Sequence, residues 1–280
     1  MGKKNKHLKV PLLDKSILKT FSIVVAFISS LVGVLAISIP FDRNYWWVWI
    51  AIWFPLLLLI YIFIFAYANK KKEASFKING TNVKVFVGDI FSVEDGLAVI
   101  PMNEYFDTQV DDVVISKTSL HGKYLLNVCK DVAAFENLVK SKLTPLEVNK
   151  DRKVTNHQNR YDLGSLIENE GYVLTAFTKF DENNKAYLYG KDYLYFWGSF
   201  WSNIDAVFAG RTVNIPLFGS GMTRLKDYNQ TKQELLENIL ITMRKTGFKN
   251  KYPDKSVNII IYEGDADEID FYHLKERVGD

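Results

Sequence analysis

Three polar segments, each following an apolar run, carry residue types that can bind a nucleotide or phosphate. The first contains Gly88, Asp89 and Ile90 and follows the apolar residues 83–87. A carboxylate at the end of a strand can accept a hydrogen bond from an amino group such as that of an adenine. Asp is also a frequent N-cap residue, so the alternative is a turn that starts a helix.

The second segment combines glycines with polar donors after the apolar run 213–217. Glycines allow positive φ and remove side chains, so successive backbone N–H groups can converge on a phosphate. The alternative is that the glycines only turn the chain. The ATP-binding pattern G-x-x-x-x-G-K-[ST] does not occur, which argues against that class of ATPase. The candidate residues are Phe218, Gly219, Ser220, Gly221, Met222, Thr223 and Arg224.

The third segment begins after the apolar run 96–101 and extends to residue 122. Loops longer than about 12 to 15 residues in a compact domain are usually functional or disordered. Its aromatic, carboxylate, hydroxyl and imidazole groups suit a polar ligand, although a histidine such as His121 is by itself more often a capping or surface residue. The candidate residues are Asn103, Phe106, Asp107, Thr108, Ser119, His121 and Gly122.

Strands that alternate with amphipathic helices are expected to position these segments. This alternation predicts a three-layer α/β/α domain with a mixed sheet, in which ligands bind outside the carboxyl ends of the strands. The aperiodic segment 150–158 is expected to be an exposed loop. The predicted strands are 76–78 and 83–87, joined by an Asn79-Gly80 turn, then 96–101, 163–167, 171–177, 212–218 and 257–262. The predicted helices are 123–143, 192–208, 231–246 and 265–277.

Charge and hydrophobicity divide the chain near residue 72. Residues 1–72 contain ten Lys or Arg and two Asp or Glu, a net charge of +8, which leaves −5 of the total +3 for the remaining 208 residues. The mildly acidic remainder argues against nucleic-acid binding, which normally requires clustered basic residues. The single cysteine, Cys129, excludes an intrachain disulfide and a cysteine metal cluster. We expect no bound metal and no cofactor.

Two uncharged segments, 21–39 and 45–68, contain 19 and 24 residues. About 20 apolar residues cross a bilayer as a helix, so we predict a transmembrane hairpin. A cleaved signal peptide is the alternative for the first segment, but its length exceeds the usual apolar core of about 7 to 15 residues. The predicted parts are a basic N-terminus at 1–20, the hairpin at 21–68, a linker at 69–75 and a soluble domain at 76–280.

The lysines on either side of the hairpin predict its orientation. Six precede the first segment, and Lys70, Lys71 and Lys72 follow the second. The positive-inside rule then places both termini in the cytoplasm. Because neither segment contains an ionisable residue, the hairpin is expected to be an anchor or part of an assembly and not an ion pathway.

The three polar segments, in this order, resemble a divergent macro domain, the α/β/α module that binds ADP-ribose. By that resemblance Asp89 matches the aspartate that holds adenine, and Gly219, Ser220 and Gly221 match the late phosphate loop. Asn103 lies near an asparagine that faces the distal ribose. The glycine run that follows this asparagine in catalytic members is replaced by residues 106–108, which argues against hydrolysis of ADP-ribosyl groups.

Two membrane segments before such a domain, with N-E-Y-F-D-T, S-L-H-G and G-S-G-M-T-R, are similar to the macro-domain membrane effectors of type II Thoeris antiphage systems. The resemblance implies a partner TIR-domain enzyme that consumes NAD and releases histidine-ADP-ribose or a related ADP-ribose derivative. It further implies a protein of the bacterial inner membrane that is not an enzyme. On binding the signal, the protein would form a homo-oligomer, damage the membrane and kill the infected cell.

Two alternatives keep the macro-domain fold and change the activity. One is a membrane-tethered ADP-ribosyl hydrolase, in which Asp107 or His121 would activate water. The other is a membrane-bound scaffold that recruits ADP-ribosylated proteins. Turnover of the ligand distinguishes the first alternative, and preference for modified protein over free nucleotide distinguishes the second.

Overall fold

The computed structural model describes residues 8–36, 46–155, 157–221, 223–227, 229–249, 252 and 254–280. The chain forms two compact units. Residues 1–72 together with 270–273 make up the hairpin unit, and residues 73–269 together with 274–280 make up the sheet unit. The predicted boundary near residue 72 therefore coincides with a division between units, except that four residues from near the C-terminus belong to the first.

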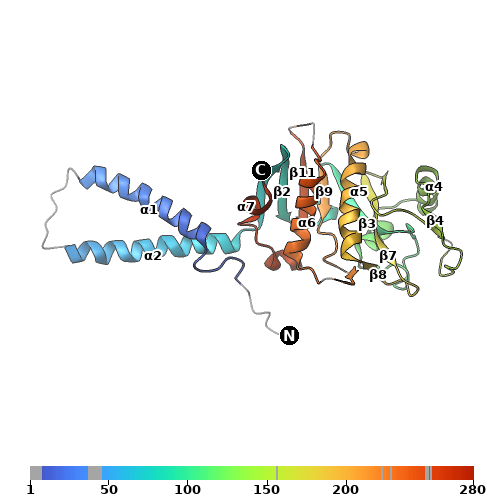
Figure 1. The fold of residues 1–280 in the computed structure, drawn as a ribbon, viewed down its shortest axis with the longest axis horizontal. Helices are drawn as coiled ribbons and strands as arrows, with labels where there is room; N and C mark the ends of the chain where they lie inside the picture. The colour runs from blue at the N-terminus through green and yellow to red at the C-terminus, as the bar shows by residue number, and fades with distance from the viewer. Residues whose placement is uncertain are drawn as a thin grey trace. The chain divides into compact units, whose positions relative to one another are not determined.

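The hairpin unit consists of two long apolar helices, α1 (Lys15–Ala36) and α2 (Trp46–Lys70) (Figure 1). Segments Lys15–Gly33 and Trp46–Lys70 are long and apolar enough to cross a membrane, and most of their side chains are not buried by the protein itself. Apolar surface of this extent is stable in lipid and unfavourable in water. Residues 37–39 and 45 of the predicted spans, the turn between them and the first seven residues lie outside the described chain.

Specific contacts fix the base of the hairpin. The Asp14 carboxylate caps α1 by accepting hydrogen bonds from the N–H groups of Ser16 (2.8 Å) and Ile17 (3.3 Å). Val10 and Asn69 exchange two hydrogen bonds between the N-terminal segment and the end of α2. A small apolar cluster surrounds these contacts and contains Val10, Ile17, Ile64, Ala68 and Tyr272.

The sheet unit is built on a mixed sheet with the strand order β1-β2-β11-β9-β3-β7-β8-β10, in which β6 also pairs with β7. The neighbours β2, β11, β9, β3 and β7 run parallel to one another. The strands are β1 (Glu73–Ile78), β2 (Thr81–Val87), β3 (Leu97–Asn103), β6 (Leu166–Asn169), β7 (Tyr172–Phe180), β8 (Ala186–Leu188), β9 (Val213–Pro216), β10 (Arg224–Leu225) and β11 (Ser256–Ile261). A separate pair is formed by β4 (Glu147–Val148) and β5 (Asn159–Arg160).

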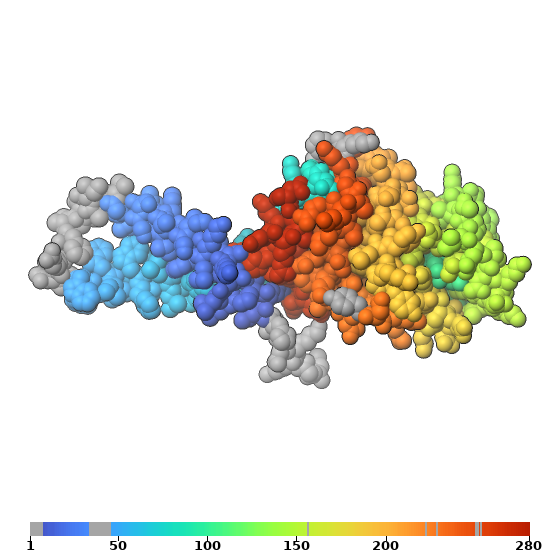
Figure 2. All heavy atoms as spheres, viewed as in Figure 1, coloured from blue at the N-terminus to red at the C-terminus, as the bar shows by residue number. Residues whose placement is uncertain are grey.

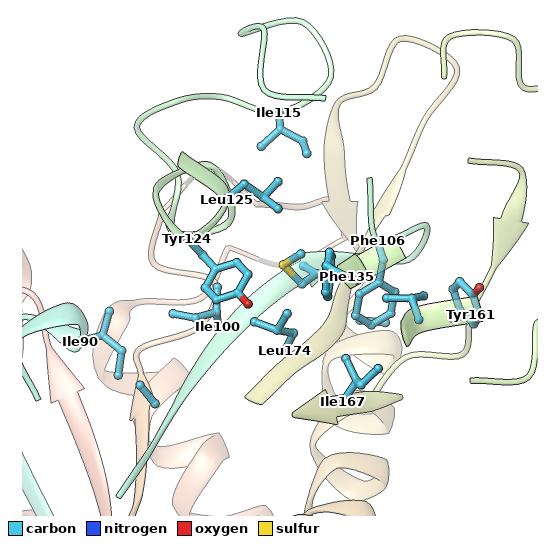
Figure 3. Packing of buried hydrophobic residues seen from close by; sticks show 14 of the residues in the cluster. Ile90, Ile100, Phe106, Ile115, Tyr124, Leu125, Phe135, Tyr161, Ile167 and Leu174 are labelled. Carbon is cyan, nitrogen blue, oxygen red and sulfur yellow. The ribbon is translucent and has the colours of Figure 1, made fainter. Parts of the chain in front are cut away.

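Helices cover both faces of this sheet, as predicted. On one face α3 (Leu120–Asn127) and α4 (Val132–Lys142) contribute Tyr124 and Phe135 to a core with Ile100 and Leu174 (Figure 3). On the other face lie α5 (Gly190–Phe208) and α6 (Lys232–Lys245), which cover the side of the sheet seen in Figure 2. There Trp197 packs against Phe218, with 5.4 Å between ring centroids. The domain is thus a three-layer α/β/α structure.

Three of the predicted elements are corrected by the structure. The helix expected at 123–143 is divided into α3 and α4, because Asp131 caps a new helix by accepting from the N–H of Ala134. The helix expected at 265–277 is replaced by the 3-10 helix η3 (Glu263–Glu268) and the short α7 (Leu274–Val278). Between them, the Asp270 carboxylate accepts from the N–H groups of Tyr272 and His273, so these amides are unavailable to a continuous helix.

The third correction concerns the segment 150–158, expected to be an exposed loop. Its described residues are irregular, but the side chain of Arg152 is only 7% exposed. Its partner is Asp107, 45 residues earlier in the chain. A charge can be buried in this way only because an opposite charge and further hydrogen bonds accompany it.

Candidate ligand-binding site

The parallel strands bring the beginnings of the three predicted segments to one edge of the sheet. Asp89 follows β2, Asn103 ends β3, and Phe218 comes two residues after β9. Hydrogen bonds continue past the strands, from Gly88 N–H to the Ile261 carbonyl (2.9 Å) and from Leu217 N–H to the Ile260 carbonyl (3.2 Å). This carboxyl edge is where ligands bind in open α/β sheets.

Asp89 occupies an exposed turn at this edge. Its Oδ1 accepts a hydrogen bond from Phe91 N–H at 3.1 Å and caps the 3-10 helix η2 (Ile90–Ser92). The neighbouring Ile90 is buried in the core and has a packing role. The Asp89 carboxylate therefore is a helix cap and, because it is exposed, can also accept from a ligand through its second oxygen.

The glycine loop, defined as residues 218–221, is bound to α5 through the hydroxyl of Tyr193. The Tyr193 hydroxyl donates towards the carbonyls of Phe218 (3.2 Å) and Leu235 (3.3 Å). Gly219 has φ +87°, which disfavours any other residue, whereas a Cβ added to Gly221 would meet no atom within 4 Å. The Ser220 hydroxyl turns back to the Leu217 carbonyl at 3.0 Å. Met222 lies outside the described residues.

Thr223 and Arg224 follow the glycine loop closely in the chain. Arg224 lies on β10, which pairs with β8 at the sheet edge, and Thr223 directly precedes β10. Because Arg224 is only three residues beyond Gly221, the chain keeps it within about 11 Å of the loop. The donor role of these two residues stays a prediction.

Asn103 and Asp107 form the centre of a buried polar network. Asn103 donates from Nδ2 to Asp107 Oδ2 at 2.8 Å, and its Oδ1 accepts from the N–H groups of Tyr105 and Asp107. Arg152 binds both Asp107 oxygens, at 2.8 and 2.6 Å, and Thr155 donates to Oδ1 at 3.0 Å. Asp107 is completely buried, and the Arg152 guanidinium stacks on the Tyr105 ring at 3.9 Å.

Thr108 belongs to a second, partly exposed cluster beside this network. Its hydroxyl donates to Glu136 Oε1 at 2.5 Å, and His157 Nε2 lies 3.2 Å from the same oxygen. Burial opposes ionisation of Glu136, but the hydrogen bonds from Thr108 and His157 outweigh it and lower the pKa of this carboxyl. The cluster ties α4 to the segment that carries Arg152.

The backbone of the third segment is fixed by contacts of Ser119, His121 and Gly122. Ser119 caps α3 by accepting from Gly122 N–H at 2.9 Å, and a Cβ at Gly122 would lie 2.2 Å from the Ser116 carbonyl oxygen. His121 Nε2 lies 2.8 Å from the Asp107 carbonyl oxygen, and burial lowers the pKa of His121 to about 4. The ring is therefore neutral at pH 7 and donates to that carbonyl.

Phe106 is likewise a core residue, packed edge-to-face on Tyr161 with φ +49°. The candidates from the third segment thus divide into a polar network around Asp107 and residues that shape the backbone. The sequence did not identify Arg152 as a member of this network, because a single arginine in an aperiodic charged segment gives no local signal. Among the described residues, no group of three or more His, Cys, Asp or Glu could hold a metal ion.

A small cavity of about 130 Å³, which the sequence did not predict either, is lined in part by Glu104, directly after β3, and by Lys179 near the end of β7. It contains both acidic and basic groups. Its lining residues are Glu104, Leu146, Arg160, Tyr161, Asp162, Leu163, Lys179, Asp192 and Tyr195.

Comparison with known proteins gives a match over most of the chain. The family model described as "Thoeris protein ThsA, Macro domain" matches residues 83–262. A Thoeris protein ThsA from Bacillus amyloliquefaciens (strain Y2) is 38% identical over 207 residues, which cover 72% of this chain and 69% of that protein. The match to the family model includes Asp89, Asn103 and residues 218–221.

Solved macrodomains are similar at low sequence identity. A mutant of the Oceanobacillus iheyensis macrodomain has 11% identity and a TM-score of 0.45, and covers 74% of this chain and 97% of that chain. The same macrodomain with ADP has 13% identity and a TM-score of 0.41, over 73% and 95% of the two chains. The macrodomain of Thermus aquaticus DarG has 9% identity and a TM-score of 0.40, over 65% and 97%.

Proposed function

This chain belongs to the Thoeris ThsA macro-domain family, and from that membership we propose that it is a membrane effector whose macro domain binds histidine-ADP-ribose. Family membership itself implies a role in antiphage defence and a ligand of the ADP-ribose type. The signal would be the diffusible product of a TIR-domain enzyme that consumes NAD. The protein would be held in the bacterial inner membrane with both termini in the cytoplasm, consistent with its two apolar helices.

The observation that carries this proposal is the shared edge of Asp89 and the glycine loop. The carboxylate follows β2 and the loop follows β9, with only β11 between these strands. The exposed Asp89 carboxylate after β2 and a loop with two glycines after β9 suit a nucleotide that lies across the carboxyl ends of these strands. Because residues 73–280 carry a net charge of −5, backbone N–H groups must supply much of the diphosphate binding.

Two features favour binding over hydrolysis. A general base must be able to approach a water or substrate and accept its proton. Asp107 is buried and accepts hydrogen bonds from Nη1 and Nη2 of Arg152. His121 binds the backbone carbonyl of Asp107 and has a pKa of about 4. Both groups considered for the hydrolase alternative are therefore engaged elsewhere.

Signal binding would then drive assembly through the apolar helices. A ligand shifts an equilibrium only by its differential affinity for the two states, and a decisive shift needs about 5.5 kcal/mol. The assembled form must therefore bind histidine-ADP-ribose far more tightly than the resting form. In the proposed order of events, the resulting homo-oligomer disrupts the membrane and the infected cell dies.

The full-length protein, purified in detergent and in parallel reconstituted in liposomes, tests the proposal. We expect stoichiometric binding of histidine-ADP-ribose without turnover, growth of the oligomer and release of a liposome dye. NAD serves as the control ligand and should do none of these. Tight binding that changes neither assembly nor leakage would contradict the effector function, and catalytic consumption of ligand would support the hydrolase.

A further inference from the structure

The residues that follow β11 lead from the carboxyl edge of the sheet into the hairpin unit. β11 lies between β2 and β9, so it ends between the Asp89 turn and the glycine loop. Tyr262 and η3 come next and belong to the sheet unit, whereas residues 270–273 belong to the hairpin unit. Only eight residues separate Ile261, the last residue of β11, from Asp270. Residues 262–273 are called the relay segment below.

The first turn of α6 packs against the glycine loop. The Tyr193 hydroxyl donates towards the carbonyls of both Phe218 in the loop and Leu235 in α6. A Cβ added to Gly219 would lie 3.4 Å from Cδ2 of Leu235, which is ordinary contact distance. A group that binds to the loop therefore acts on this turn of α6, which begins at Lys232.

One lysine and two carboxylates join the same turn of α6 to the relay segment. Lys232 Nζ donates to Asp265 Oδ1 at 2.7 Å and to Glu268 Oε1 at 2.9 Å, and both carboxylates belong to η3. The side chains of Lys232 and Asp265 are only 21% and 12% exposed. Because partly buried charges are little screened by salt and water, η3 must follow a displacement of this turn or break the pairs.

The other end of the relay segment is bound to the N-terminal end of α1. Asp270 Oδ2 lies 2.6 Å from His273 Nδ1, and His273 Nε2 lies 3.1 Å from Asp14 Oδ1, the oxygen that caps α1. The Tyr272 hydroxyl lies 3.2 Å from the hydroxyl of Thr20 in the same helix. Since only one residue separates Asp270 from η3, a shift of η3 changes the geometry of these contacts.

We propose that the relay segment transmits occupancy of the glycine loop to the cap of α1, with Lys232 and His273 as its two joints. This inference rests on the proposed function, because it takes an ADP-ribose derivative as the ligand of the loop. Coupling between distant sites requires packed or hydrogen-bonded groups that have alternative arrangements. Within each unit every step of this path is such a contact, and the peptide chain at residues 269–270 joins the two halves of the path.

Amide hydrogen exchange of the full-length protein in detergent, with and without histidine-ADP-ribose, tests the path. In the parent we expect exchange in η3 and at the amides of Ser16 and Ile17, which Asp14 caps, to change by about fivefold or more on binding. This is the size of one helix-cap contribution. Lys232→Met should lose both changes. His273→Phe should keep the change in η3 and lose the change at α1, because it interrupts the path later.

Affinity for the ligand separates the relay from the binding site itself. Both variants should bind histidine-ADP-ribose within about twofold of the parent at protein concentrations below those at which it assembles, where assembly does not alter affinity. Arg277→Met is the matched control. Arg277 also joins the C-terminal residues to α6, through Glu237 at 2.7 Å, but this pair lies outside the path, so the variant should keep both changes in exchange. Should Lys232→Met fail to fold, Glu268→Gln weakens the same joint and should reduce both changes.

The outcomes distinguish the relay from the proposed function. A parent whose η3 and α1 amides do not respond to bound ligand, or relay variants that respond as the parent does, would overturn the inference and leave the proposed function intact. A parent that responds at both places, yet neither assembles nor releases liposome dye, would reject the effector function and support the relay. A parent that does not bind the ligand would reject both.

Discussion

Arg152 Nη1 and Nη2 donate to the two carboxylate oxygens of Asp107, at 2.8 and 2.6 Å, across 45 residues of sequence. Bidentate geometry of this kind is the strongest form of ion pair available to these side chains. It ties Arg152 to the residues that follow β3, where Asn149 also donates to the Tyr105 hydroxyl. The edge of the proposed site is thus formed by residues that are distant in sequence.

Removing the arginine should destabilise the domain strongly. Arg152→Met leaves the Asp107 carboxylate buried without its partner, which we expect to reduce the free energy of unfolding by about 3 to 5 kcal/mol. The double variant Asp107→Asn/Arg152→Met should recover part of this loss, because no charge is left buried. Chemical unfolding of the full chain in detergent measures both. A loss below about 1 kcal/mol in the single variant would show that the pair is solvated in solution.

Two substitutions at the sheet edge should weaken ligand binding without unfolding the protein. Asp89→Asn keeps an acceptor for Phe91 N–H and replaces the second oxygen with a donor, and Gly221→Val places a side chain in open space over the glycine loop. We expect each to lower the affinity for histidine-ADP-ribose by about tenfold, or about 1.4 kcal/mol. Isothermal titration measures this change, with melting temperatures as the test of folding.

Gly198→Val is the control for the glycine substitution. A Cβ at Gly198 also meets no atom within 4 Å, but this residue lies in α5 and away from the loop. It should leave affinity unchanged. If Asp89→Asn and Gly221→Val also bind within about twofold of the parent, the site has been placed wrongly.

Acid should destabilise the domain through His121. Burial lowers the pKa of this residue to about 4 from an ordinary value of 6.5, so the unfolded chain binds the proton more readily. The stability contributed by neutral His121 is complete above pH 6.5 and is lost as the pH falls towards 4, by about 3 kcal/mol at most. Unfolding measured at pH 7, 6 and 5 should show this slope, and His121→Gln, which retains a donor, should flatten it.

The base of the hairpin should respond to pH in the opposite direction. Burial opposes protonation of His273, but hydrogen bonds and charges of Asp270 (2.6 Å) and Asp14 (3.1 Å) outweigh it and raise the pKa above its ordinary value of 6.5. The contact is therefore fully present below pH 6.5 and weakens as the pH rises through the raised value. A histidine NMR titration of the full chain in micelles should place His273 above 6.5, and Asp270→Asn should lower its pKa.

The parts of the fold that follow from local pattern were predictable from the sequence. Continuous apolar runs identified β3 and β9, which are buried on both faces, and amphipathic periodicity identified α5 and α6. The same patterns located the segments at the carboxyl edge. The family resemblance supplied the macro-domain fold, which the family match confirms.

The features that the sequence did not predict depend on contacts between distant residues. No local pattern connects Asp107 with Arg152, and none predicts that Asp270 will bind the amides of Tyr272 and His273 and interrupt a helix. The paired strands β8 and β10 are too short to show periodicity, so the pairing of Arg224 with Tyr187 was not foreseen. Long-range side-chain pairing, and not propensity, decides these features.

Because residues 270–273 complete the hairpin unit, that unit is not a portable module. A chimera that joins residues 1–72 to a foreign domain would lack Tyr272, whose hydroxyl lies 3.2 Å from that of Thr20, and the imidazole of His273 beside Asp14. A protein truncated after residue 269 would have the same deficit. Exchange of the sheet unit for another domain would therefore have to keep residues 270–273 together with the hairpin.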